Sequence, residues 1–236
     1  NLTSKFIFLS IGAGVSHAFG LSLVSYALAK GRSGVIAPTS TVFEICVPVL
    51  AATVFAKALG FYSYIGILIL ISSIFLLRKA DNESHETSVL KDLIYGLGAG
   101  TGFGLSITFL SFIANEAKNN SLVIMQLASI VFLTSLLVIG KIKDKNQEIG
   151  FKNLKSSFIL INIFVFLFFE MTGLIFLNAA LKNGNGGIVA ALASIPFTLG
   201  IILISVIFLK EKLSKVQYIG VGIAVIGIAI THLSTI

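Results

Sequence analysis

Three ionisable residues, His17, Glu44 and Glu170, lie near the middle of long apolar segments. His17 is the twelfth of 24 residues in its segment, Glu44 the eleventh of 23 and Glu170 the fourteenth of 25. If these segments cross a membrane, each ionisable side chain costs about 2.5 kcal/mol or more at the bilayer centre, so it requires a partner, water or a function. These residues are therefore the first candidates for a substrate or proton pathway.

His17 and Glu170 are 153 residues apart, which is also the offset of an internal repeat in the chain. Equivalent residues of two repeats related by an axis in the membrane plane lie at similar depth and can face one another across a cavity. A carboxyl group beside an imidazole can exchange a proton near neutral pH, as proton-coupled export requires. The plainer alternative is that each side chain is hydrogen-bonded to a neighbouring helix.

Glu44 lies four residues before Pro48 in one apolar segment. Proline lacks an N–H and its ring clashes with the carbonyl group four residues earlier, which here belongs to Glu44. A kink at this point would open the backbone to a cavity or to a substrate amine, and the alternative is a packing kink beside a protonated carboxyl group. We expect Pro38, in the same segment, and Pro196, in the matching helix of the repeat, to mark bends as well.

Two neutral polar residues, Tyr26 and Asn178, are added to the predicted substrate or proton pathway. Neutral polar side chains in membrane helices commonly form hydrogen bonds between helices, which is the alternative for both.

Gly96, Gly100 and Gly104 recur every four residues and therefore line one face of a helix. Such a face lets another backbone approach closely, so these glycines are predicted to pack helices. The surrounding run has a dinucleotide-like glycine spacing, but it follows no strand and lies in an apolar segment, which argues against that site. Three dispersed histidines and one cysteine form no metal-ligand pattern, so neither a metal nor a cofactor other than a coupled proton is predicted.

The composition explains why these segments must lie in a membrane. The chain has 236 residues, of which 56% are hydrophobic and 11% charged, and its mean hydropathy is +1.01. A soluble domain of this size is roughly a quarter charged, so the chain cannot cover a water-exposed surface. A soluble enzyme and a nucleic-acid-binding protein are therefore excluded.

Eight apolar runs are long enough to cross about 30 Å of hydrocarbon, which takes about 20 residues of helix. The stretches Ile65–Leu77 and Ile219–Ile230 are continuously apolar, whereas the strands of a membrane barrel alternate apolar and polar residues. The sequence therefore predicts an all-α polytopic membrane protein with helices at residues 6–29, 34–56, 61–77, 93–114, 121–140, 157–181, 187–209 and 216–232.

The positive charges predict the orientation of these helices. If the loops lie on alternating sides, 13 of the 17 Lys and Arg residues fall on one side and four on the other. Cytoplasmic loops carry the excess of positive charge, which leaves the C-terminus outside. The net charge of +7 is thus a topology signal, and no nucleic-acid partner is assigned to it.

An internal repeat aligns residues 17–57 with residues 170–210 without a gap, and ten of the 41 positions are identical. Sixteen residues precede His17, whereas Glu170 lies 78 residues after Asp92, a difference of about two helices. We therefore expect a ten-helix protein of two five-helix repeats, which are inverted because five is odd. The expected division is a truncated first repeat of three helices at 1–80, a loop at 81–91 and a second repeat of five helices at 92–236.

Four short motifs stand out along the chain: Ser25-Tyr26-Ala27-Leu28, Gly34-Val35-Ile36-Ala37-Pro38, residues 190–196 and Phe208-Leu209-Lys210-Glu211-Lys212-Leu213. They resemble the EamA-type drug/metabolite transporter superfamily, and the likeness covers all eight helices. The resemblance implies a ten-helix secondary transporter with a central cavity between two repeats, and such proteins often export amino acids or other metabolites. It also implies that both termini lie in the cytoplasm, opposite to the C-terminal orientation that the lysines predict.

The predicted function is secondary active transport of a small organic metabolite, such as amino-acid or drug efflux, by alternating access between inverted repeats. The predicted partners are the lipid bilayer of a prokaryotic inner or plasma membrane, a small-molecule substrate and a second copy in a homodimer. An intramembrane enzyme using His17 and a glutamate as acid and base is the first alternative, but no nucleophile or metal motif accompanies them. A passive channel or a structural membrane subunit is the second.

Overall fold

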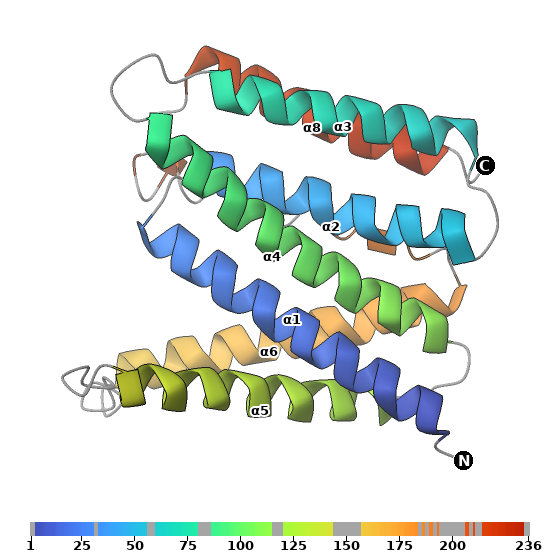
Figure 1. The fold of residues 1–236 in the computed structure, drawn as a ribbon, viewed down its shortest axis with the longest axis vertical. Coiled ribbons are helices and arrows are strands. Elements are labelled where there is room, and N and C mark those ends of the chain that lie inside the picture. The colour runs from blue at the N-terminus through green and yellow to red at the C-terminus, as the bar shows by residue number, and fades with distance from the viewer. Residues whose placement is uncertain are drawn as a thin grey trace.

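The chain forms long helices and no strand within the residues that the structure, a computed structural model, describes (Figure 1). The predicted helix at 187–209, with its Pro196, lies outside them apart from a few single positions. The described residues are 3–30, 33–55, 60–79, 86–114, 120–143, 157–183 and 214–233, together with 186, 189, 190, 193, 206, 207 and 210.

Seven helices correspond to seven of the eight predicted ones. Their ends agree with the apolar runs to within three residues, apart from the start of the fourth. The helices are α1 (Ser4–Lys30), α2 (Ser33–Phe55), α3 (Phe61–Lys79), α4 (Glu86–Ile113), α5 (Asn120–Lys143), α6 (Ser157–Asn183) and α8 (Lys215–Leu233).

The start of α4 differs from the prediction, because this helix begins at Glu86 rather than near residue 93. Its first turns include Glu86, Leu90 and Lys91, which are good helix formers although two of them are charged. An apolar run marks the part of a helix that lies in hydrocarbon, and a polar extension of the same helix leaves no such signal. Residues 86–91 of the predicted 81–91 loop are therefore helical.

Hydroxyl side chains inside the helices mostly donate to the carbonyl group one turn earlier. Ser10 donates to Phe6 O at 2.8 Å, and Thr108 donates to Gly104 O at 2.8 Å. This local hydrogen bond satisfies a hydroxyl group without water, which is why serine and threonine are tolerated in apolar helices.

Four of the described helical segments are long and apolar enough to cross a membrane: Ser4–Ala29, Val35–Phe55, Leu90–Ile113 and Asn120–Gly140. Many large apolar side chains on these and the other helices are exposed, including Phe8, Leu127 and Phe176. Exposed apolar surface of this extent suits contact with lipid tails and not with water.

The helices form a row in which α4 occupies the middle (Figure 1). α4 packs closely against α2 on one side and α1 on the other, and α1 in turn packs against α5. α3 and α8 form a pair beside α2. α6 lies at the opposite end of the row and packs much less extensively than these pairs do.

Glycines make the two sides of α4 unusually close to their neighbours. A Cβ atom added at Gly96 would lie 2.8 Å from the Cβ of Thr39 on α2, and one added at Gly104 would lie 2.8 Å from the Cβ of Val47 on α2. A Cβ atom added at Gly100 would collide with the backbone carbonyl group of Ser40, also on α2. On the other side, a Cβ at Gly102 would lie 2.7 Å from Ser16 O of α1. The three glycines at four-residue spacing thus form the α2–α4 seam, by which name we refer to this contact.

Candidate functional site

The structure brings His17 of α1 and Glu170 of α6 together. His17 Nε2 lies 3.3 Å from Glu170 Oε1, and the side chains retain 16% and 19% of their exposure. A tight charge-assisted hydrogen bond is shorter, at about 2.7–2.9 Å. The pair is therefore a partly buried and relatively loose contact between two ionisable groups.

Three helices place the imidazole of His17. Close packing fixes α1 against α4, where a Cβ at Gly20 would lie 2.9 Å from Ala99 O. Ser129 of α5 donates a hydrogen bond of 2.8 Å to Gly14 O of α1. Phe103 of α4 meets the imidazole ring edge-on, with centroids 5.4 Å apart at an interplanar angle of 61°. The imidazole therefore contacts an aromatic ring of α4 and the carboxyl group of Glu170.

The carboxyl group of Glu170 is carried by a helix with one covered face. Leu174 and Leu181 follow Glu170 at helical spacing and belong to the largest buried cluster, with side chains of α1, α4 and α5 such as Phe6, Leu110 and Met125. The remaining faces of α6 carry exposed phenylalanines, among them Phe164, Phe168 and Phe176. Glu170 therefore projects from the covered face, because residues four apart share one side of a helix.

Asn178 lies on the same covered face of α6, two turns beyond Glu170. Its side chain is 2% exposed and its Oδ1 atom has no hydrogen-bond partner. A helix rises 1.5 Å per residue, so the two positions are about 12 Å apart along the axis. The structure therefore places Asn178 in the same part of the molecule as the pair but not in contact with it.

Glu44 lies on α2, a helix that runs through both Pro38 and Pro48 without a break. The carbonyl oxygen of Glu44, which the ring of Pro48 deprives of its helical donor, would lie 3.1 Å from a Cβ at Gly104. This carbonyl group therefore faces the α2–α4 seam, where backbone packs against backbone, rather than an open cavity. Its side chain is partly buried and has a partner.

Tyr26 lies far from the pair. It is nine residues after His17 on α1, about 13 Å along the helix axis. Its ring is 46% exposed and meets Tyr95 of α4 edge-on, with centroids 5.4 Å apart. The structure therefore joins Tyr26 to α4 and not to His17 or Glu170.

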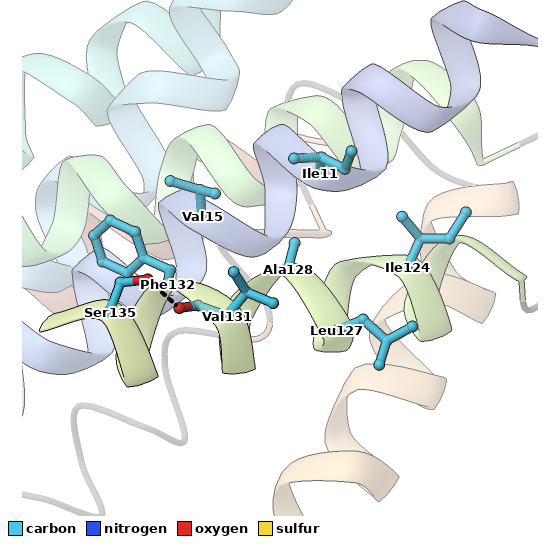
Figure 2. Close-up of a pocket in the computed structure, with 8 residues that line it drawn as sticks. All are labelled: Ile11, Val15, Ile124, Leu127, Ala128, Val131, Phe132 and Ser135. Atoms are coloured by element: carbon cyan, nitrogen blue, oxygen red, sulfur yellow. Dashed lines mark hydrogen bonds between the residues drawn. The ribbon is translucent and has the colours of Figure 1, made fainter. Parts of the chain in front are cut away.

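An apolar groove of about 480 Å³ lies between α1 and α5 (Figure 2). Its one polar side chain, Ser135, donates its hydroxyl to Val131 O at 2.7 Å and so offers little to a ligand. The groove therefore suits hydrocarbon and not a polar solute. Its lining is Ile11, Val15, Ile124, Leu127, Ala128, Val131, Phe132 and Ser135, and His17 is not part of it.

Two residues that help to position His17, Phe103 and Ser129, are not predictable from the sequence. Phenylalanine is abundant throughout the chain, with 20 copies, so a single one carries no signal. The hydrogen bond from Ser129 to Gly14 joins residues 115 positions apart without any repeat to relate them. Neither residue could have been singled out from spacing.

The comparisons with known proteins identify the family. The model of the EamA-like transporter family matches residues 90–233, which is more than half of the chain and extends from α4 into the last turn of α8. No curated protein matches the chain. The matched region includes Glu170 and Asn178, whereas His17 precedes it. The chain therefore belongs to the EamA-like transporter family of the drug/metabolite transporter superfamily and is a multi-pass membrane protein.

Proposed function

We propose that this protein is a secondary active transporter that exports a small organic solute by alternating access between two inverted repeats, with the His17–Glu170 pair as its proton-responsive centre. The observation that carries the proposal is the 3.3 Å contact between these two ionisable side chains in the middle of apolar helices. Membrane proteins retain such residues chiefly along substrate and ion pathways.

The helix boundaries support the repeat. Both ends of α6 lie 153 residues after the corresponding ends of α1, and both helices have 27 residues. Both ends of α8 lie 154 residues after those of α3, and both have 19 residues. The sequence offset of 153 therefore also relates helices of equal length.

The contacts between equivalent helices support inversion of the repeats. α1 and α6 run in opposite directions (Figure 1), as an axis in the membrane plane requires. α3 and α8 also pack against one another. His17 contacts its own repeat equivalent, Glu170, and a residue can do this only close to the axis that relates the repeats.

The pair supplies a simple means of coupling. When the imidazole is protonated and the carboxyl group ionised, their attraction holds α6 against α1. Transfer of the proton from His17 to Glu170 neutralises both groups and removes this attraction, after which α6 can tilt relative to α1. Loss of the proton to one side of the membrane and its return from the other would drive one transport cycle.

Flux measurements in proteoliposomes test this proposal, with a metabolite panel that includes amino acids and with an imposed pH gradient. We expect saturable flux that collapses when the gradient is dissipated, and we expect His17→Ala and Glu170→Gln each to abolish its gradient-dependent part. Ser22→Ala and Thr172→Val are matched controls on α1 and α6, because each hydroxyl donates to its own helix.

The remaining outcomes separate the alternatives. If His17→Ala and Glu170→Gln both leave flux and its pH dependence unchanged, the pair has no role in coupling. Flux that persists without a gradient indicates a facilitative carrier or a channel. If no solute of the panel moves, the transport proposal itself fails and the enzyme and structural alternatives gain support.

A further inference from the structure

Five buried side-chain atoms among the described residues have no hydrogen-bond partner, although most hydroxyls in these helices are satisfied locally. An unsatisfied buried polar group costs about 1–3 kcal/mol, so each one requires an explanation. The five atoms are Thr39 Oγ1, Ser40 Oγ, Ser121 Oγ, Gln126 Nε2 and Asn178 Oδ1.

Asn178 is the one of these residues that shares a helix face with an ionisable residue of the proposed transport site. Thr39 and Ser40 lie at the α2–α4 seam, where a Cβ at Gly96 or Gly100 would already collide with them, so no ligand fits there. Ser121 and Gln126 are on α5. Asn178 and Glu170 project from the same covered face of α6.

The free atom of Asn178 defines the chemistry of its missing partner. Oδ1 is a carbonyl oxygen and only accepts hydrogen bonds, so the partner must be an N–H or O–H donor. Its side chain is 2% exposed, and Leu174 and Leu181, its neighbours on that face, belong to an apolar cluster. The acceptor thus lies in surroundings where a hydrogen bond is strong.

Glu170 offers a second acceptor on the same face, and its carboxylate attracts a cation. A solute that carries an ammonium group would satisfy both positions in turn, since it has positive charge and N–H donors. It would also compete with the imidazole of His17 for Glu170, because both cations bind the same oxygen. A quaternary ammonium has the charge but no N–H, so it cannot satisfy Asn178.

We propose that Asn178 is a specificity-determining residue of the transport site, whose Oδ1 accepts a hydrogen bond from the N–H of an amine-bearing solute. This inference rests on the proposed transport function and adds the class of solute. In the present conformation the face of α6 that carries Asn178 is buried. A tilt of α6 relative to α1 would expose the amide on the face that also carries Glu170.

Transport kinetics of the full-length protein in proteoliposomes test this assignment. The probes are amine-bearing metabolites, amino acids included, each paired with its N-trimethyl derivative. Asn178→Leu removes the acceptor at similar volume, and we expect it to raise the KM of N–H-bearing solutes about 10-fold, the value of one hydrogen bond to a charged group. The KM of the trimethyl derivatives should change little.

Two further readouts separate recognition from a structural role. Removal of an unsatisfied acceptor should leave the unfolding midpoint of Asn178→Leu in detergent unchanged or higher, whereas a structural hydrogen bond would be lost and the midpoint would fall. Asn178→Asp keeps an oxygen acceptor and should preserve the preference for N–H-bearing solutes. Thr172→Val on the same helix is the control.

The possible results bear differently on the two proposals. Equal changes in KM for both members of each pair, or a fall in the midpoint with no change in preference, would overturn the role of Asn178 while leaving transport intact. The proposed role of Asn178 would also be overturned if the protein transported only solutes that lack N–H donors. If the wild-type protein moves nothing, both proposals fail together.

Discussion

At the scale of single residues, two ionisable side chains meet in the middle of apolar helices. His17 and Glu170 meet at 3.3 Å, and Phe103 packs against the imidazole in a T-shaped arrangement. A separation above 3 Å weakens an ion pair. A contact with this property suits a pair whose attraction changes during the proposed cycle.

The pair predicts that its members can be exchanged. His17→Glu alone places two carboxyl groups together and Glu170→His alone places two imidazoles together, so both single variants should lose flux. The double swap restores one of each at the contact. Neighbouring residues couple by about 0.5–3 kcal/mol, so flux of the double variant should exceed the product of the single effects about 2-fold to 100-fold.

Flux assays of the four proteins, normalised to the amount reconstituted, measure this coupling. Simple multiplication of the two single effects would show that His17 and Glu170 act independently, despite their contact.

At the scale of helices, α4 determines how closely its neighbours pack. Its glycines face α2 at Gly96, Gly100 and Gly104 and face α1 at Gly102. In lipid, helix association depends on close van der Waals packing, because lipid tails are as apolar as the helices. α1, which carries His17, is therefore held in part by backbone contact with α4.

Replacement of glycine by alanine should affect stability differently inside and outside the α2–α4 seam. Gly100→Ala inserts a Cβ into the backbone of α2 at Ser40 and should destabilise the protein by about 1–3 kcal/mol. Gly173→Ala on α6 meets nothing within 4 Å and should be neutral or stabilising by up to about 1 kcal/mol, because alanine is the better helix former.

Unfolding midpoints in detergent decide between these expectations. A loss of stability at Gly173 as large as that at Gly100 would mean that the open face of α6 is covered in the protein studied.

The helices and the contact between His17 and Glu170 can be predicted from the sequence, whereas the details of packing cannot. Long apolar runs locate seven helices, since hydrocarbon thickness sets their length. The offset of 153 predicts the meeting of His17 and Glu170, and the structure has this contact. The start of α4 at Glu86 and the position of the Glu44 carbonyl at Gly104 depend on polar extensions and on particular neighbours. Neither leaves a periodic signal.

At the scale of the whole molecule, α6 has one covered face and exposed outer faces along its length. Leu174 and Leu181 belong to the buried cluster that includes side chains of α1, α4 and α5, and Asn178 is also buried. On the outer faces, Phe164 near the start of the helix and Phe176 near its end are each 70% exposed. The proposed cycle would therefore move the covered face of α6 relative to α1.

Alternation predicts that the two ends of α6 move in opposite directions relative to α1. One pair of spin labels, at Lys5 and Lys182, reports the distance between the start of α1 and the end of α6, and a second pair, at Ala29 and Ile161, reports the distance between the opposite ends. We expect a transported solute to change the two distances in opposite senses, as measured by pulsed electron paramagnetic resonance.

The same two distances are measured in the Glu170→Gln variant for comparison, because this variant lacks the charge that responds to the proton. Changes of the same sign in both distances would indicate that α6 leaves α1 as a whole, which contradicts alternating access.

The position of the contact has a mechanical consequence. His17 and Glu170 are each the fourteenth of 27 residues, so they divide α1 and α6 into arms of 13 residues, about 20 Å long. With its fulcrum at the midpoint, α6 is a balanced lever, and a tilt of about 10° would move its two tips by roughly 3–4 Å in opposite senses. One tip cannot rise without the other falling. A rigid helix pivoting on this contact would therefore never open both sides of the membrane at once, and leakage would require loss of the fulcrum itself.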